Sequence, residues 1–312
     1  MRDWERIALG DAVITGIERG HYDTVVVYGH LFGGPFAAVV DPERGVQVLD
    51  VPGSDPVSFA AVSEQIELAT AGLPPLHLLE DRLPGSPAKR HGPLKVCGDV
   101  DTSDLVRLWP VCGDEDAQVV ALDKDGRLRV IDVVGGDPPE GTGLWAAAED
   151  PRSTSLLVGQ AAMMACVAGL LRGGGGHEPG QQLWVSDPYD GWKRLDLEPA
   201  PEAFTDIYSG FSAAIAGHRA GLPLLFDEYG TRLETPAVPL QPDHPMVCVL
   251  NASDTEVELA LQSAEAGPQL WIGGAVRPWT VEPLPTGRLE AARGRGENLW
   301  VLVGGQVWRS RR

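Results

Sequence analysis

Two segments far apart in the chain follow the same pattern of residues. The first reads YGHLFGGPFAAVVDPERG, from Tyr28 to Gly45, and the second reads AGHRAGLPLLFDEYG, from Ala216 to Gly230. Each has Gly-His, then a Gly and a Pro, an apolar run, an Asp and a closing Gly. A pattern that recurs in this way indicates an internal structural repeat, which restricts the possible folds more than composition does.

Short apolar runs extend this repeat along the chain. They are rich in β-branched residues and separated by turn residues, whereas helical periodicity is scarce. The runs group into sets of four, at residues 11–53, 94–135, 143–199, 203–240, 246–285 and 288–312. The first four sets carry an Asp and a Gly between the third and fourth run: Asp41 and Gly45, Asp123 and Gly126, Asp187 and Gly191, Asp227 and Gly230. The Asp can bond the backbone of a turn, and Gly adopts a positive φ, so strand–turn–strand units are predicted.

Four short strands in every 40–50 residues or so are typical of a β-propeller blade. The last set lacks its fourth strand, while Trp4–Leu9 forms a run that belongs to no set. Pairing Trp4–Leu9 with the strand that holds Val307 and Trp308 completes this blade and covers a sheet edge. We therefore predict an all-β fold, a six-bladed β-propeller in a single domain over 1–312, whose N-terminal strand closes the last blade.

Two runs resemble strand ends of known propellers. LLFDEYG, Leu224 to Gly230, and LWVSDPYDG, Leu183 to Gly191, are similar to the third strands of WD-repeat and related propellers, although no Trp-Asp pair ends any such strand here. SDPYDGW, Ser186 to Trp192, resembles a sialidase Asp-box with altered spacing. The resemblance implies a degenerate WD-repeat-like architecture and no particular activity, because propellers host many functions.

Two segments outside the repeat predict helices. In 54–91, DPVSFAAVSEQIELATAG places Phe59, Val62 and Ile66 at steps of three and four. A hidden blade in this segment, making seven in all, is the alternative. In 161–180, AAMMACVAGLLRG predicts a helix and GGGHEPG a loop. We expect both insertions on one face of the propeller, either as lids over a ligand site or as covers for apolar surface.

The charge balance restricts the possible partners. The chain has 25 basic and 44 acidic residues, a formal net charge of −19. This charge repels phosphate backbones, so nucleic-acid binding is not expected. It favours a basic partner or a small cationic ligand, or it reflects a solvated acidic surface.

The cysteines and the N-terminal sequence indicate the cellular compartment of the protein. Cys97, Cys112, Cys166 and Cys248 form no C-x-x-C pair, which predicts buried thiols in a reducing compartment, without a metal site. MRDWERIALG lacks the apolar region of a secretion signal, and polar residues interrupt the uncharged stretch 153–171. Arg172–Gly180 lacks the Lys-Ser/Thr of a phosphate loop. We expect a cytoplasmic protein without membrane contact or cofactor.

The loops that lead into the first strand of a blade supply the candidate site. They carry Asp11, Asp137, Glu140, Glu202, Asp243 and His244. Clustered carboxylates would favour the imidazolium form of a nearby histidine and would suit acid–base chemistry or a cation. The best catalytic candidates are His244, Asp243 and Glu140. Ordinary polar loop chemistry explains the same residues equally well.

Histidines complete the candidate ligand-binding set. His30 and His218 occupy equivalent positions where the second strand turns into the third, and His177 lies in the Gly-rich loop. In a six-bladed ring His30 and His218 would stand on opposite blades, so they could not share a metal ion. Each either stabilises its own turn or contacts a ligand.

No recognisable catalytic motif stands out from this pattern. We therefore predict that the propeller binds a partner protein or a small ligand through its decorated face. The alternative is an enzyme, a hydrolase or lyase, whose active site lies under the two insertions and uses His244 with nearby carboxylates.

Overall fold

The structure is a computed structural model that describes residues 2–19, 24–49, 56–62, 65–70, 76–79, 89–93, 104–112, 117–132, 143–149, 151, 155–161, 164–173, 178–187, 191–209, 213–253, 255–294 and 298–311. The chain forms two compact units, which we call the terminal unit (Met1–Ile17 with Leu195–Arg312) and the central unit (Glu18–Arg194). The regular elements over these residues are β-strands. No helix found there has the length and apolar character needed to cross a membrane.

The terminal unit contains three antiparallel sheets, each built from strands in chain order. The first has β18 (Ala203–Tyr208), β19 (Ala214–Arg219) and β20 (Leu222–Asp227). The second has β21 (Val247–Ala252), β22 (Val257–Ser263), β23 (Gly267–Gly274) and β24 (Arg277–Pro283). The third has β25 (Leu289–Arg293), β26 (Trp300–Val303), β27 (Gln306–Arg311) and β1 (Asp3–Arg6).

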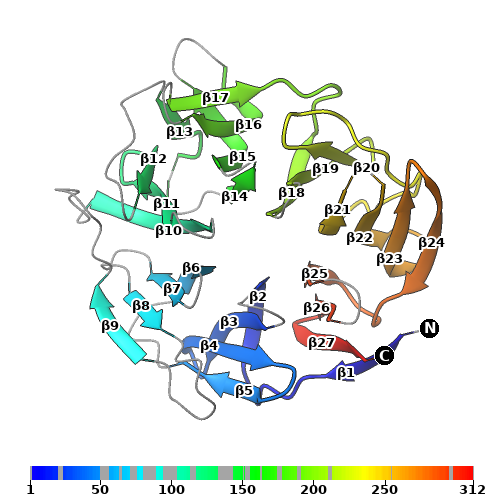
Figure 1. Cartoon of the computed structure of the whole chain (residues 1–312), viewed down its shortest axis with the longest axis horizontal. Helices are drawn as coiled ribbons and strands as arrows, with labels where there is room; N and C mark the ends of the chain where they lie inside the picture. The colour runs from blue at the N-terminus through cyan, green and yellow to red at the C-terminus, as the bar shows by residue number, and fades with distance from the viewer. Residues whose placement is uncertain are drawn as a thin grey trace. The chain divides into compact units, whose positions relative to one another are not determined.

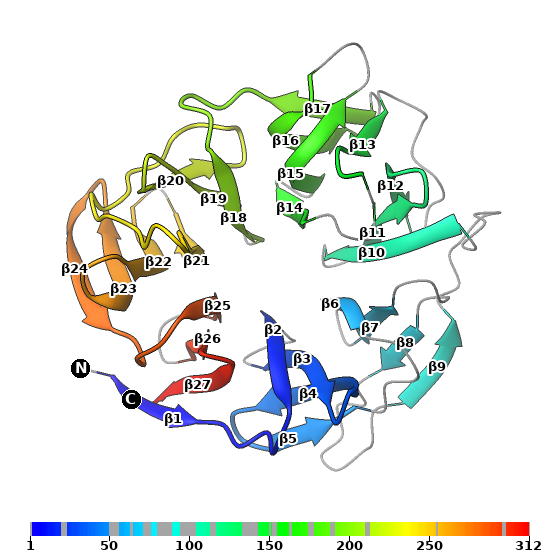
Figure 2. The same ribbon diagram turned by 180° about the vertical axis from the view of Figure 1, so that it is seen from behind.

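The N-terminal strand completes the last sheet, as the sequence predicts. β1 pairs antiparallel with β27, with Trp4 opposite Ser310 and Arg6 opposite Trp308. The ladder continues one residue further, where the Ile7 N–H donates to the Val307 carbonyl over 2.9 Å. Figures 1 and 2 both show the two chain ends beside each other at this sheet. The predicted closure is confirmed.

Apolar side chains join the three sheets of the terminal unit. One buried cluster combines residues of the β18–β20 and β21–β24 sheets, including Leu225 and Leu259. A second cluster combines residues of the β21–β24 and β25–β1 sheets, including Leu270 and Val301, with Trp4 and Trp308 packed against it. Each sheet is therefore stabilised by burial of apolar surface against its neighbour along the chain.

The central unit contains two four-stranded sheets and one eight-stranded sheet. The first has β2 (Val13–Arg19), β3 (Val25–Leu31), β4 (Gly34–Asp41) and β5 (Gly45–Val48), and the second has β6 (Pro56–Val62), β7 (Gln65–Thr70), β8 (Leu76–Leu79) and β9 (Lys89–Pro93). The boundary between the units falls within β2. The large sheet has β10 (Leu105–Cys112), β11 (Ala117–Asp123), β12 (Arg127–Asp132), β13 (Leu144–Ala146), β14 (Leu157–Ala161), β15 (Met164–Gly173), β16 (Gly180–Asp187) and β17 (Gly191–Leu195).

The helix predicted in 54–91 is wrong for the residues that the structure describes. Strands β6 to β9 occupy this segment and form a sheet of their own. The apolar residues at steps of three and four are split between two strands. Within β6, Phe59 and Ala61 alternate with small residues, and within β7 Ile66 and Leu68 alternate with polar residues, which is the period of a strand.

The helix predicted in 161–180 is also wrong where the structure describes it. AAMMACVAGLLRG instead supplies β15, which pairs with β14 and β13 on one side and with β16 on the other. Residues Ala165 to Ala168 are fully buried. A strand buried on both faces is apolar at every position and loses the alternation that identifies strands. The loop at 174–177 lies outside the described residues.

The repeated Gly-His pattern encodes a tight hairpin in both of its occurrences. His30 pairs with Pro35 across β3 and β4, and His218 pairs with Pro223 across β19 and β20. The two central turn residues have positive φ in each case, at 52° and 80° for Phe32 and Gly33, and 51° and 71° for Ala220 and Gly221. This is the type I′ geometry that matches strand twist. The predicted equivalence of the two segments is confirmed.

The Asp-Gly turns also form as predicted. The Asp227 Oδ1 accepts hydrogen bonds from the N–H groups of Tyr229 (2.9 Å) and Thr231 (2.7 Å), and Asp41 and Asp123 each accept two such bonds in their own turns. The closing glycines have positive φ: Gly45 84°, Gly126 80°, Gly191 76° and Gly230 83°. Side chain and backbone thus act together in the turns of Asp41, Asp123 and Asp227, whereas the side chain of Asp187 lies outside the described residues.

Replacing Asp227 tests this turn. Asp227→Ala leaves two backbone N–H groups without their acceptor, so we expect the free energy of unfolding to fall by about 1–2 kcal/mol. Asp227→Asn keeps an acceptor oxygen and should lose less than half as much. Urea denaturation of the three proteins measures the difference. Equal losses in both variants would mean that charge, not the hydrogen bonds, stabilises the turn.

Candidate binding surface of the terminal unit

The loops that precede β18 and β21 carry three of the predicted site residues, and β19 carries a fourth, His218. Glu202 lies directly before β18, and Asp243 and His244 lie shortly before β21. The Thr205 hydroxyl of β18 donates to the Val247 carbonyl of β21 over 2.8 Å, so the two strands lie side by side. His218 is paired with Ala203, next to Glu202. Glu202, His218, Asp243 and His244 therefore belong to one end of neighbouring sheets.

His244 connects two sheets through both of its ring nitrogens. Its Nε2–H donates to the carbonyl of Leu289 at the start of β25, and its Nδ1 accepts a hydrogen bond from Arg288 Nη2 at 3.0 Å. A carbonyl only accepts and a guanidinium only donates, which assigns the proton to Nε2. Among the described residues, the hydrogen-bond partners of the ring are thus a carbonyl and a cation, not carboxylates.

Backbone hydrogen bonds fix the loop that carries Asp243 and His244. The His244 N–H closes a turn on the Gln241 carbonyl at 3.0 Å, with Pro242 inside the turn. Gln262, at the end of β22, accepts from the Gln241 N–H at 2.9 Å and donates to the Met246 carbonyl at 3.0 Å. Its side-chain Oε1 accepts from the Leu289 N–H at 2.8 Å. Hydrogen bonds therefore hold this loop in place, and Asp243 is exposed on it.

His218 faces Glu202 across 3.8 Å from Nδ1 to Oε2. The Glu202 N–H also donates to the His218 carbonyl at 2.8 Å, which holds the two residues together. Burial lowers the pKa of His218, and the opposing attraction of the Glu202 carboxylate is the smaller effect because that carboxylate is well exposed. His218 Nδ1 makes no hydrogen bond within the described residues, so this atom does not show the predicted stabilisation of its own turn.

The lowered pKa of His218 predicts a pH dependence of stability. The unfolded chain, with a histidine pKa near 6.5, binds more protons than the folded one between the two pKa values, so stability falls as the pH drops below about 6.5. His218→Gln should remove this part of the acid destabilisation. The measurement is urea unfolding of both proteins at about pH 7.5 and about pH 5. A wild type that gains stability over the variant on acidification would show that Glu202 governs the ring.

An ion pair of a buried carboxylate and a partly buried arginine joins all three sheets of the terminal unit close to these loops. Asp206 of β18 is buried, and its Oδ2 accepts from the Val249 N–H of β21 at 2.9 Å. Arg293 Nη1 of β25 lies 3.3 Å from the same carboxylate. Asp206 and Arg293 are not among the residues predicted from the sequence. The one signal is a charged residue within the apolar run AFTDIY.

The remaining predicted residues lie elsewhere. His30 is on β3 in the central unit, and Asp11 is exposed in the turn before β2. Asp137, Glu140 and His177 lie outside the described residues, so a convergence of carboxylates around His244 stays a prediction. Over the residues with described positions, no three His, Cys, Asp or Glu side chains lie together as a metal site would require.

Two of the four cysteines have described side chains, and both are buried free thiols. Cys166 lies in β15 and Cys248 in β21. Burial raises the pKa of the Cys166 thiol to about 12, so this residue is not a nucleophile near neutral pH. The prediction of buried thiols is confirmed for these two residues.

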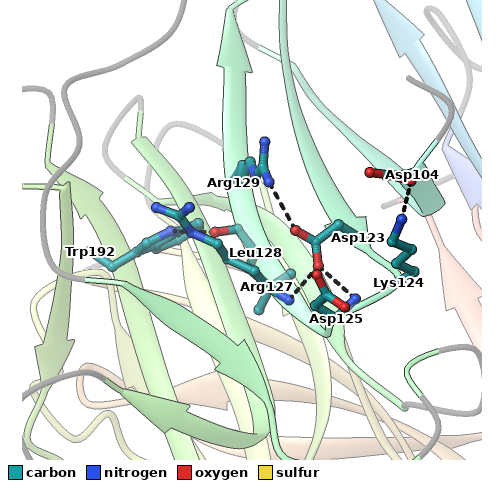
Figure 3. Close-up of polar contacts among 8 residues, drawn as sticks. All are labelled: Asp104, Asp123, Lys124, Asp125, Arg127, Leu128, Arg129 and Trp192. Carbon is teal, nitrogen blue, oxygen red and sulfur yellow. Dashed lines mark hydrogen bonds and ion pairs between the residues drawn. The ribbon is translucent and has the colours of Figure 1, made fainter. Parts of the chain in front are cut away.

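The central unit has a polar network of its own around Asp123 (Figure 3). The buried Asp123 carboxylate binds two N–H groups of its turn and Arg129 Nη2 at 3.0 Å. Lys124 pairs with Asp104 at 2.5 Å on the surface, and the Trp192 indole N–H donates to the Leu128 carbonyl at 3.3 Å. These contacts fix strand β12, because its first residues are held from both sides.

Comparison with known proteins finds similar structures but no similar sequences. No protein-family model matches the chain, and no curated protein matches its sequence. Streptogramin B lyase superposes with a TM-score of 0.63 at 10% identity, over 100% of this chain and 97% of the other. The WD40 domain of Neurospora crassa Pan2 superposes with a TM-score of 0.58 at 16% identity, over 100% and 96%.

The chain is a β-propeller. A catalytically inactive virginiamycin B lyase from Staphylococcus aureus, crystallised with quinupristin, gives a TM-score of 0.61 at 8% identity, over 100% of this chain and 99% of the other. The propeller thus resembles both lyases and a WD40 domain, at identities that establish the fold and not the activity. The predicted WD-repeat-like architecture is confirmed.

Proposed function

We propose that this propeller is a non-catalytic scaffold that binds a basic partner protein through Glu202 and Asp243. The observation that carries the proposal is that two exposed carboxylates stand on rigid loops at one end of neighbouring sheets. The Glu202 side chain is 57% exposed, and Asp243 is exposed. The net charge of −19 attracts a basic partner at long range. Preorganised loops also reduce the entropy lost on binding.

The contacts of His244 favour a scaffold over an enzyme. A general base needs a free ring nitrogen within reach of a substrate proton. In His244 one nitrogen is bonded to the Leu289 carbonyl and the other to Arg288. The ring therefore acts as a strut between two sheets, which suits the precise positioning of the neighbouring Asp243.

A fluorescein-labelled oligolysine peptide tests the proposed surface. We expect Glu202→Gln and Asp243→Asn each to weaken its binding by up to about fivefold, the scale of an exposed ion pair. Glu234→Gln is the matched control, because Glu234 is also exposed in the terminal unit but lies on the segment after β20. Fluorescence anisotropy at low and at moderate salt measures the affinity. If all three variants weaken binding equally, the peptide responds only to the net charge of the protein, and the proposal is contradicted.

The pair of His218 and Glu202 supports a second candidate, a hydrolase or lyase. A histidine kept neutral by burial and faced by a carboxylate has the parts of a general base. The lyases among the similar structures share the fold with this chain. A thermal-shift screen of small metabolites, repeated with His218→Gln, separates the two functions. A metabolite that stabilises only the wild type favours the enzyme.

The number of blades is part of this proposal. The eight-stranded sheet divides into β10–β13 and β14–β17, since β13 bridges β12 and β15 by short ladders. Counting these as two blades, with β6–β9 as a further one and β18–β20 as a blade whose outer segment is irregular, supports seven blades. Seven is the alternative that the sequence prediction named beside six.

A further inference from the structure

The exposed face of the large sheet in the central unit carries a row of Arg, Trp and Arg on neighbouring strands. Arg127 of β12 pairs with Trp145 of β13, and Trp145 pairs with Arg172 of β15. Directly opposed residues project from the same face of a sheet. Figures 1 and 2 both show β12, β13 and β15 in one group of strands.

The opposite face of the same strands is the core of the unit. Leu128, Leu144 and Leu171 alternate with the row and belong to one buried cluster. This alternation fixes the direction in which the row points, because successive strand residues face opposite sides. The row therefore lies on the face of the sheet opposite the core, where Arg172 is exposed and Arg127 and Trp145 are half-buried.

Gly143 and Arg172 hold the Trp145 ring in a defined position. A Cβ added to Gly143 would lie 2.3 Å from the Trp145 ring, so the indole lies against bare backbone. The Arg172 guanidinium stands over the ring at 6.0 Å from its centroid. Trp145 is half-buried and Arg172 exposed, and Leu170 beside them is 44% exposed. An apolar surface flanked by cations is thus preorganised.

The cations of the row keep their charge available. Figure 3 shows the Arg129 guanidinium turned toward Asp123, whereas that of Arg127 extends away from it. Arg129 is neutralised by Asp123 at 3.0 Å. Among the residues whose side chains are described, neither Arg127 nor Arg172 forms an ion pair. Within that part of the chain, whose net charge is −19 overall, the two guanidinium groups therefore have no fixed carboxylate.

We propose that Arg127, Trp145 and Arg172 form a docking surface for an acidic segment of a partner protein. Charge complementarity selects the occupant, because each guanidinium binds a carboxylate through two parallel hydrogen bonds. Two strand spacings separate the Cα atoms of the arginines by about 10 Å, and carboxylates on one side of an extended chain repeat every 7 Å or so, a difference that long side chains bridge. The half-buried indole packs against the segment between its carboxylates.

A labelled peptide in which Glu and Ser alternate tests this surface on the full chain. We expect Arg172→Glu to weaken binding by about tenfold or more, since it turns an attraction into a repulsion. Lys193→Glu on β17 makes the same change of charge on an exposed residue of the same unit. It should change the affinity by less than about twofold. Trp145→Leu should weaken binding by loss of aromatic contact while leaving the charge unchanged.

The outcomes separate this surface from the one on the terminal unit. Equal weakening by Arg172→Glu and Lys193→Glu, no binding by the wild type, or equal binding of a peptide with Gln in place of Glu would each overturn the proposal. Arg172→Gln serves the same comparison should the charge reversal unfold the protein, as circular dichroism reports. The probe is acidic here and basic for Glu202 and Asp243, so either surface can fail alone.

Discussion

Deletion of residues 2–9 is expected to lower the free energy of unfolding by about 5 kcal/mol or more, which is exceptional for so short a segment. The segment supplies β1, whose ladder covers the edge of β27. It also supplies Trp4, packed against an apolar cluster, and Arg2, whose side chain is 5% exposed and pairs with Glu282 at 3.0 Å. Urea denaturation, followed by circular dichroism, measures the loss.

A pair of proline variants isolates the strand pairing from the other contacts. Because the Ile7 N–H faces Val307, the Glu5 N–H two residues earlier also faces β27, while the Arg6 N–H faces away. Glu5→Pro should therefore destabilise far more than Arg6→Pro. Glu5→Ala corrects for the exposed ion pair with Arg311. If both prolines are equally tolerated, β1 does not close the sheet in solution.

The repeat could be predicted from the sequence because its turns depend on residues that are close together in the chain. The Gly-His hairpins need a positive φ at two successive residues, and only a few residue types satisfy this, so Gly33 and Gly221 mark them. The Asp turns rest on contacts between residues two to four apart, as at Asp227. The closure by β1 followed from a count of strands. Each of these features depends on neighbours in the sequence or on the period of the repeat.

The two wrong helix predictions have different physical causes. β15 reads as a helix because Ala, Met and Leu favour helices and because full burial removes the alternation of a strand. The segment forms a strand because it pairs with β14 and β16, and the sequence alone does not reveal this pairing. The segment of β6 and β7 fits both the period of a helix and the period of a strand. Two short strands joined by a turn can also place apolar residues three and four positions apart.

The sequence predicts where the candidate site residues lie, but not which groups their side chains contact. Glu202, His218, Asp243 and His244 do fall at one end of neighbouring sheets, because equivalent loops of a repeat lie at the same end. The partners of His244 are Arg288 and Leu289, which are 44 and 45 residues away. Such contacts arise from the packing of one sheet on the next, which no local pattern records.

Asp206→Ala is expected to lower the free energy of unfolding by about 3 kcal/mol, because it leaves the buried Val249 N–H without its acceptor and removes the carboxylate that pairs with Arg293. The carboxylate joins β18, β21 and β25, and its partner Arg293 is 87 residues away. Asp206→Asn keeps an acceptor for the Val249 N–H and loses only the charge, so it should fall between the wild type and the alanine variant in urea denaturation.

A double-mutant cycle with Arg293→Met decides whether the pair acts as a unit. Removing both partners leaves no uncompensated charge, so the double variant should be more stable than the sum of the single losses predicts. Strictly additive losses would show that Asp206 and Arg293 are independent in solution. Coupling at this point would mean that the three sheets of the terminal unit unfold together, and that the loops bearing Glu202 and Asp243 are held by the same contacts.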